Sequence, residues 1–298
     1  MPSRRAFLKG LLGATLAGLS AVFYSLRIEP GWRLRVRTWR VKSPAWGANR
    51  PLRLVMLADL HVGIPNMGPD RVAEIVDLAN RQGGDIILLM GDYRATHSYQ
   101  SRRVELAEVA PLLAGLRAPL GVHAILGNHD WRDDYEAFAR KTGTVRAGRA
   151  LEAVGIPVLQ NRSVRILAPG GDFWLAGLDS QAGFSYEFVP EVPGADDLPG
   201  TLAQITDDAP AILLAHEPDI FAKVPDRFAL TLSGHTHRGQ ICLFGWAPMV
   251  PSAFGQRYLY GLIEEAGRWL VVSGGLGCSG IPVRFGSPPE ITVVDLSA

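Results

Sequence analysis

Five times along this 298-residue chain, an apolar run of strand length ends in side chains that can bind a metal ion or move a proton. The fragments that follow these runs are, in order, Asp59-x-His61, Gly91-Asp92, Gly127-Asn128-His129-Asp130, His216 and Gly234-His235-x-His237. In open α/β sheets the working groups collect beyond the carboxyl ends of the strands. We therefore expect all five fragments to meet in one site.

The first fragment follows Leu54–Leu57, which has the composition of a buried strand. On an extended backbone, side chains two residues apart point to the same face, so Asp59 and His61 should point together. The same reasoning aims His235 and His237 at one cleft. A carboxylate with imidazoles suits a hard-to-borderline divalent cation.

Strands alternate with helices in the first half. The spacing of Val72, Ile75, Val76 and Ala79 predicts a helix from Pro69 to about Gly83, and a second amphipathic helix is expected over 104–116. This alternation implies βαβ units with parallel strands. In the second half we expect strands at 164–167, 173–178, 211–215, 228–233, 269–273 and 291–294, with 187–210 mostly loop and one short helix.

Composition indicates a large core and an uneven charge. The chain is 47% hydrophobic, enough to bury a sizeable core. Of the 30 basic residues nine lie at or before Lys42, against one of the 29 acidic residues, which leaves 21 basic and 28 acidic residues and a net charge of −7 for the rest. A body of that sign disfavours dedicated nucleic-acid binding. The basic N-terminal part suits an anionic membrane surface better.

The first 30 residues have the features of a targeting segment. Arg4-Arg5 precedes an apolar run of 16 residues, Leu11–Leu26, and this order resembles a twin-arginine export signal. An ordinary membrane anchor is the alternative, although the run is shorter than the roughly 20 residues that span a bilayer. Without a clean Ala-x-Ala site, cleavage and retention stay equally open. We predict a signal or anchor in 1–30 and, since no linker interrupts the rest, one catalytic domain in 31–298.

Two cysteines and two histidines fall outside the motifs. Cys242 and Cys278 form no disulfide framework or Cys-x-x-Cys motif, and we interpret them as small buried residues. His123, on a predicted strand, is interpreted as a core histidine. His97, in a polar loop, is interpreted as solvated.

The order and types of the five fragments resemble the calcineurin-like metallophosphoesterase superfamily, over nearly everything from residue 50 to the C-terminus. The twin-arginine start and the tail Gly280–Glu290 are similar to its small bacterial membrane-associated and exported branch. That branch includes cell-envelope phosphodiesterases and a pyrophosphatase acting on UDP-diacylglucosamine. The resemblance implies an α/β (α+β) fold, a four-layer αββα sandwich of two mixed sheets with flanking helices.

The resemblance also implies two divalent metal ions, which with these ligands are Mn, Fe, Zn or Co. It assigns three ligands to one ion, namely Asp59, His61 and His237, and three to the other, namely Asn128, His216 and His235. Asp92 would bridge the two ions. His129 would be the acid that assists the leaving oxygen, with Asp130 orienting its ring.

One departure from the family pattern concerns the residues after Gly91-Asp92. The family often places an apolar residue and then Asp or Asn there, whereas this chain has Tyr93-Arg94. The planar guanidinium of Arg94 suits phosphate oxygens, so we name it as a candidate substrate contact, although pairing with a surface acid explains it equally well. The same two interpretations apply to Arg238 and Gln240.

The sequence thus predicts a di-metal phosphoesterase that cuts phosphodiester, phosphomonoester or pyrophosphate bonds through a metal-bridging hydroxide, in cell-envelope or lipid-linked substrates. The alternatives are a UDP-2,3-diacylglucosamine-type pyrophosphatase, which export would disfavour, and a non-catalytic module that binds envelope lipid or polymer. Intact ligands and His129 favour an enzyme, because a binder needs no acid. The expected partners are the twin-arginine export machinery and the membrane surface, and the expected location is across, or at the outer face of, the bacterial cytoplasmic membrane.

Overall fold

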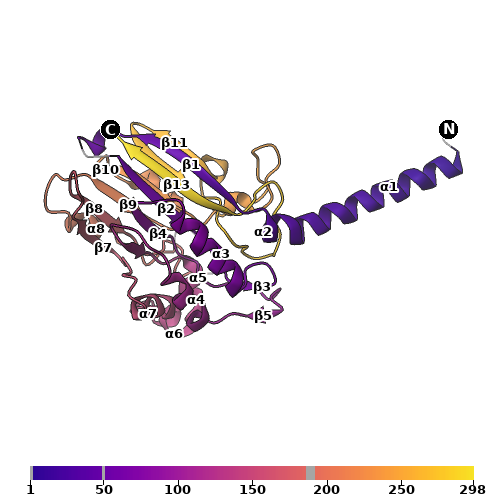
Figure 1. The fold of residues 1–298 in the computed structure, drawn as a ribbon, viewed down its shortest axis with the longest axis horizontal. Coiled ribbons are helices and arrows are strands. Elements are labelled where there is room, and N and C mark those ends of the chain that lie inside the picture. The colour runs from indigo at the N-terminus through magenta and orange to yellow at the C-terminus, as the bar shows by residue number, and fades with distance from the viewer. Residues whose placement is uncertain (1–2, 49–50, 186–191) are drawn as a thin grey trace.

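Two β-sheets stacked face to face form the body of the protein (Figure 1). The structure, a computed structural model, describes residues 3–48, 51–185 and 192–298. The first sheet has the strand order β1 (Arg35–Lys42), β13 (Glu290–Ser297), β2 (Leu52–Leu57), β4 (Ile86–Leu89) and β6 (Val122–Ala124). The second has the order β11 (Gly261–Glu265), β12 (Arg268–Val272), β10 (Phe228–Ser233), β9 (Ala211–Leu214), β8 (Phe173–Gly177) and β7 (Arg162–Ile166).

Both sheets are mixed. In the first, β2, β4 and β6 run parallel, while β13 is antiparallel to β2 and parallel to β1. In the second, the central strands β8, β9, β10 and β12 are parallel, and the edge strands β7 and β11 are antiparallel to their neighbours. A separate two-stranded antiparallel sheet pairs β3 (Gly63–Ile64) with β5 (Arg102–Arg103).

Alternation along the strands divides the core into layers. Leu54 and Met56 of β2 face the other sheet, where they join a cluster that includes Leu214 of β9 and Leu232 of β10. The intervening residues of β2 pack instead against three helices, namely α3 (Pro69–Asn80), α4 (Leu106–Leu113) and α7 (Arg146–Ala153). Short helices cover the outer face of the second sheet: α8 (Leu198–Ala203) and the 3₁₀ helix η3 (Pro218–Lys223). The αββα sandwich expected from the sequence is therefore confirmed.

The amphipathic helix after the first buried strand forms as its spacing predicts. In α3 the four apolar residues of the pattern, Val72, Ile75, Val76 and Ala79, are the buried ones. The helix expected over 104–116 is shorter and starts at Leu106, after a capping box. The expected short helix of 187–210 is α8, while residues 186–191 of that region lie outside the described residues.

The N-terminal helix is longer than the apolar run in the sequence. Helix α1 (Arg4–Phe23) continues through a π turn, η1 (Tyr24–Ile28), into α2 (Glu29–Trp32), and it projects away from the body (Figure 1). The continuous helix, Arg4–Trp32, has 29 residues and is long and apolar enough to cross a membrane, a test that signal sequences also pass. The first strand, β1, begins at Arg35, three residues after this helix ends.

The end of this helix is bonded to the body. The carbonyl of Ser25 accepts a hydrogen bond from the Arg284 amide at 2.9 Å. The buried carboxylate of Glu29 accepts from the amides of Gly286 (3.1 Å) and Ser287 (2.6 Å). These bonds fix the helix against the 284–287 segment.

Candidate metal centre

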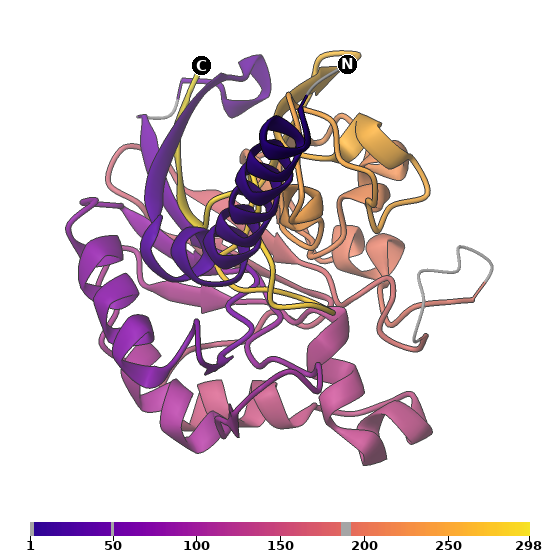
Figure 2. The same ribbon diagram turned by 90° about the vertical axis from the view of Figure 1, so that its right-hand side faces the viewer.

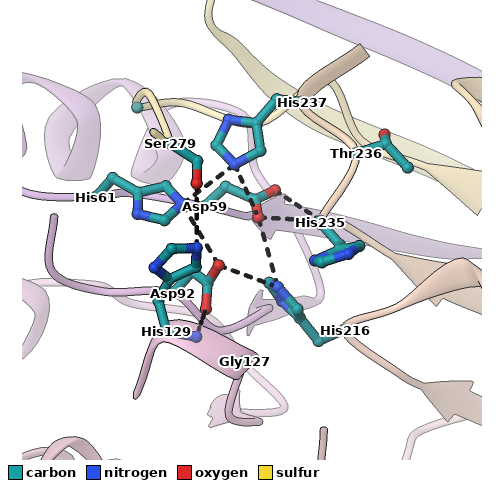
Figure 3. A network of polar contacts seen from close by, with 12 residues as sticks. Asp59, His61, Asp92, Gly127, His129, His216, His235, Thr236, His237 and Ser279 are labelled. Atoms are coloured by element: carbon teal, nitrogen blue, oxygen red, sulfur yellow. Dashed lines mark hydrogen bonds and ion pairs between the residues drawn. The ribbon is translucent and has the colours of Figure 1, made fainter. Parts of the chain in front are cut away.

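All seven predicted ligands meet at the carboxyl ends of the central strands, with both sheets contributing. From the first sheet come Asp59 and His61 after β2, Asp92 after β4 and Asn128 at the start of α5 (Asn128–Asp133), and from the second come His216 after β9 and His235 and His237 after β10. All seven side chains are buried, and Figure 3 shows the carboxylates and rings turned toward one another.

The backbone at these residues is not extended, so the geometric premise behind the two-residue spacing is wrong. Strand β2 ends at Leu57 and β10 at Ser233, before their ligands begin. Five of the ligands have positive φ angles: Asp59 (55°), His61 (40°), Asp92 (57°), His235 (69°) and His237 (51°). Non-glycine residues rarely adopt this conformation, which is costly and clusters at functional sites. The side chains converge because tight turns redirect each one.

The ligands form two groups, and one carboxylate oxygen lies close to a histidine of each. Asp59, His61 and His237 form one group and Asp92, His216 and His235 the other, with the ligand atoms of each group within 4.8 Å of one another. Oδ2 of Asp92 lies 3.2 Å from Nε2 of His216 and 3.4 Å from Nε2 of His61. One oxygen thus lies between the two groups, as a bridging ligand must.

The polar atoms here face one another as acceptors, which fits cations. Nε2 of His61 and Nε2 of His237 are 3.1 Å apart, and Nδ1 of His61 has no hydrogen-bond partner among the described residues. The amide oxygen of Asn128 faces only acceptors, including Nδ1 of His235 at 3.1 Å. A flipped amide would satisfy those contacts by hydrogen bonds, but a metal ligand needs the oxygen where it is. The donor set, without thiolate, fits Mn, Fe, Zn or Co.

Two glycines of the motifs allow the backbone to approach the carboxylates. A Cβ atom on Gly127 would lie 2.2 Å from Oδ1 of Asp92, and one on Gly234 would lie 2.7 Å from Oδ2 of Asp59. The amide of His129 donates to Oδ1 of Asp92 at 2.8 Å, and the amide of His235 donates to Oδ1 of Asp59 at 3.0 Å. Backbone donors therefore orient both carboxylates.

Charge in the centre is strongly coupled. Burial alone would raise the pKa of Asp92, but attraction to His216 and His129 holds that pKa well below its usual range. Burial opposes the charged form of His216, yet Asp92 raises the pKa of His216 well above its usual value. Nδ1 of His216 lies 2.7 Å from the Met90 carbonyl and donates to it, which leaves Nε2 toward Asp92. A metal ion competes with a proton for that nitrogen.

His129 lies beside the ligands, with its ring held by hydroxyl groups. Nδ1 is 2.5 Å from Oγ1 of Thr96, and Nε2 is 3.0 Å from Oγ of Ser279. Burial, together with nearby His61 and Arg132, lowers the pKa of His129 to about 3 despite the opposing effect of Asp92. His129 is therefore a neutral imidazole at pH 7 and donates through a single N–H.

Asp130 does not orient the His129 ring, so that prediction is wrong. Its carboxylate accepts instead from three backbone amides, those of Asp92 (2.8 Å), Tyr93 (3.0 Å) and Gly127 (2.8 Å). Burial and the charge of Asp92 raise the pKa of Asp130 to about 7. Asp130 therefore holds two ligand loops together and does not contact the reacting groups.

Arg94, Arg238 and Gln240, the candidate substrate contacts, all contact other residues of the protein. Arg94 is buried and forms ion pairs with Glu105 and Asp133, which fits the acid-pairing interpretation and not a substrate contact. Arg238 stacks over the Tyr260 ring at 4.5 Å. Gln240 exchanges hydrogen bonds with the backbone of residue 279.

Two arginines near the ligands were not predicted. Nη2 of buried Arg284 lies 3.3 Å from Nδ1 of His237, and the same guanidinium donates to the carbonyls of Gly274 and Gly277. Arg132 lies four residues after Asn128, one helical turn along α5, and lines the cleft over the centre. That one-turn spacing is a signal that could have found Arg132.

A cleft of about 710 Å³ opens over the centre. One side carries Asp92, Asn128, His129, Arg132 and the two histidines of Gly-His-x-His. The other side is the mainly apolar segment 248–253. The cleft thus joins a polar floor to an apolar wall. Cys242 and Cys278 are buried and free, as interpreted from the sequence.

The chain belongs to the calcineurin-like phosphoesterase family, whose sequence model matches residues 52–239. It is therefore a metal-dependent phosphoesterase, and this fold with its clustered His and Asp ligands uses two divalent ions.

Two bacterial relatives align with nearly the whole chain, and two further similar proteins align with most of it. An uncharacterized metallophosphoesterase of Bacillus subtilis, YkuE, is 32% identical over 99% of this chain and 98% of its own length. The phosphodiesterase YaeI of Escherichia coli is 30% identical over 99% of this chain and 100% of its own. A zebrafish (Danio rerio) transmembrane protein with a metallophosphoesterase domain is 32% identical over 82% of this chain and 53% of its own. The solved Haemophilus influenzae NAD nucleotidase aligns with a TM-score of 0.47 at 16% identity, over 76% of this chain and 46% of its own.

Proposed function

We propose that this enzyme hydrolyses phosphodiester bonds in lipid-linked or other cell-envelope substrates, from the outer face of a bacterial cytoplasmic membrane to which its N-terminal helix attaches it. The observation that carries the catalytic part is the position of Asp92, whose Oδ2 lies between two buried ligand groups at the floor of a cleft. The two ligand groups would hold two metal ions, which when bound would supply a nucleophilic hydroxide at neutral pH and neutralise charge on the phosphoryl oxygens.

The chain's own residues bind and orient the substrate. Arg132 lines the cleft beside Asn128, so its guanidinium can bind a phosphate oxygen. His129, held by Thr96 and Ser279, is placed to donate its single N–H to the leaving oxygen. The apolar wall at 248–253 suits an organic group esterified to the phosphate.

Three observations support the membrane part of the proposal. Helix Arg4–Trp32 has the length and composition of a span, and none of its apolar stretch is buried in the body. Arg4-Arg5 precedes that stretch, as in twin-arginine signals. The zebrafish relative is named a transmembrane protein.

Turnover of bis(p-nitrophenyl) phosphate with added Mn²⁺ tests the catalytic part, because a non-catalytic lipid- or polymer-binding module would give none. Export is tested separately, by replacing Arg4 and Arg5 with Lys in a chain that carries a reporter after residue 45. Export of the reporter should stop. Undiminished export, or export through the general secretory route, would contradict the twin-arginine assignment.

A further inference from the structure

Between Gln240 and Pro248, which both line the cleft, the chain makes a tight hairpin with an aromatic tip. Backbone hydrogen bonds of 2.8 and 3.0 Å join Leu243 to Trp246, and Phe244 and Gly245 form the turn at φ angles of 52° and 87°. Hairpins of this kind prefer Asn or Gly where φ is positive. A bulky residue there is a genuine outlier, and Phe244 is also fully exposed. Neither folding nor packing of the described body explains a phenylalanine at this tip.

Other exposed apolar side chains accompany Phe244. Trp246 is 57% exposed, Met249 is 78% exposed and Ile281 is 45% exposed. Met249 belongs to the apolar wall of the cleft, and Ile281 follows Gly280, which lines the same cleft. Single exposed apolar residues are ordinary, but grouped ones mark a surface that binds a partner. We call Phe244, Trp246, Met249 and Ile281 the apolar rim.

The apolar rim and the N-terminal helix meet on one face of the molecule. Figure 2 looks onto this face, with α1 coming toward the viewer and the orange 241–258 segment beside it. Phe285 links the two, because its carbonyl accepts from the Cys242 amide at 2.8 Å and its ring packs edge-on against the Tyr24 ring at 6.0 Å. The helix also ends at this face with Trp32, which is 75% exposed.

The direction of the helix is fixed relative to the rim. Helical backbone runs from Arg4 through the π turn at Tyr24–Ile28 to Trp32, so the apolar part of the helix joins the body without an intervening loop. Glu29 accepts from the amides of Gly286 and Ser287, and the Asn66 side chain donates to the Leu26 carbonyl at 3.0 Å. If the helix enters a bilayer, this face must lie toward the bilayer surface.

We propose that the apolar rim inserts into the interfacial layer of the membrane that holds the N-terminal helix, and so places the mouth of the cleft against the lipid surface. The proposal rests on the membrane attachment given under the proposed function and deepens it by naming the surface that docks. Aromatic residues such as Phe244 and Trp246 favour this layer. An amphiphilic phosphoester could then present its phosphate to the cleft while its apolar part stays in the bilayer.

A fluorescent label tests contact without relying on catalysis. Full-length protein carrying Phe244→Cys, labelled there with nitrobenzoxadiazole, is reconstituted in phosphatidylcholine–phosphatidylglycerol vesicles that contain shallow doxyl-labelled lipid. The matched control is Leu167→Cys, an apolar position in the β7–β8 turn that is 74% exposed and lies away from α1 (Figure 1). We expect strong quenching and a blue-shifted emission at 244 and neither change at 167. Equal signals at both positions, or energy transfer between copies labelled at 244 without quenching by lipid, would overturn the proposal.

A matched pair of substrates tests the consequence for turnover. Both release p-nitrophenolate: soluble bis(p-nitrophenyl) phosphate, and the p-nitrophenyl ester of phosphatidic acid in vesicles. Phe244→Ser combined with Trp246→Ser should lower the rate on the vesicle substrate about tenfold or more, because two apolar side chains no longer enter the interface. Its rate on the soluble ester should stay within about twofold, as for the control Tyr135→Ser with Leu167→Ser.

These outcomes separate the two proposals. Equal loss on both substrates would overturn the docking role, because it would indicate damage to the centre. If the parent protein hydrolysed neither substrate, the catalytic proposal would be rejected. The label at 244 would still decide membrane contact.

Discussion

The floor and the rim of the cleft differ in which side chains are exposed to water. At the floor, carboxylates, imidazoles and an amide are buried, and at the rim aromatic and aliphatic side chains are exposed. Both regions hold non-glycine residues at positive φ, for example Asp92 at 57° and Phe244 at 52°. Sequences break local rules of this kind mainly at functional sites.

The two regions differ in where the compensation lies. Asp92 is held by the His129 amide and by charges of neighbouring histidines, so its burial is balanced within the chain and its ions. Phe244 is fully exposed and gains nothing comparable from the described body. The comparison teaches that the residues of the floor stabilise one another as a reactive centre. The exposed apolar side chains of the rim would be stabilised only by a partner outside the chain.

Asp92→Asn should have the largest effect, because a neutral amide bridges two cations poorly. We expect loss of one or both ions and of hydrolysis, measured by metal analysis together with bis(p-nitrophenyl) phosphate turnover. His216→Ala, the control, should chiefly weaken one site. If Asp92 only shapes its turn, Asn should serve as well, since both residues favour turns. Two tightly held ions with near-parent turnover would therefore remove Asp92 from the bridge.

His129→Ala should keep both ions and slow the reaction about 10²–10⁴-fold for esters with poor leaving groups, the usual range for side chains that assist a leaving group, because the hydrogen bond from the neutral imidazole is lost. The loss should shrink for p-nitrophenolate, which leaves without a proton. The alternative is real, since His61, Asp92 and His129 also form a third possible ligand group. Loss of an ion from this variant would show that His129 is a metal ligand and does not assist the leaving group.

Glu29→Gln should act on the junction that connects the two regions. Gln keeps the shape, but it places an amide nitrogen against one of the two backbone donors, Gly286 or Ser287. A loss of about 1–3 kcal/mol in the free energy of unfolding is expected for one buried unsatisfied group. Ser287 also donates its hydroxyl to the His237 carbonyl, so affinity for one ion should fall more than for the other. Chemical unfolding and metal titration check this, with the exposed Glu74→Gln as control.

Replacing Asp179, a buried acid outside the ligand set, should give the smallest effect on stability, and this effect should depend on pH. Burial raises the pKa of Asp179 to about 6 although Trp131, Gln160 and the Ser180 amide donate to it. The folded protein then holds this proton more tightly than the unfolded chain, so the contribution of Asp179 to stability is present below about pH 4 and is lost as pH rises to about 6.

Asp179→Asn should therefore flatten the fall in unfolding free energy between pH 4 and 6.5 by about 1–3 kcal/mol. Urea unfolding of apo parent and variant at both pH values measures it. An unchanged slope would show that Asp179 ionises normally.

Much of the floor was predictable from sequence because it follows local rules. Apolar strands ended by polar fragments located every ligand, and helical spacing located the buried face of α3. Left-handed turns at Asp59 and His61 could not be predicted from a two-residue spacing, which fits an extended backbone equally well. The partners of Asp130 are backbone amides, which carry no residue-specific signal. The bonds between Glu29 and Ser287 cross most of the chain, so no local pattern predicts them.

The junction at Glu29 also sets a practical limit on shortening the chain for expression. A chain that starts at Tyr24 loses only the projecting helix α1 and keeps Ser25, Glu29 and the edge-on contact with Phe285. A chain that starts at residue 31, where the sequence predicts the domain boundary, leaves the amides of Gly286 and Ser287 without their acceptor. Solubility gained at that second position would come at the expense of the loop that supports His237.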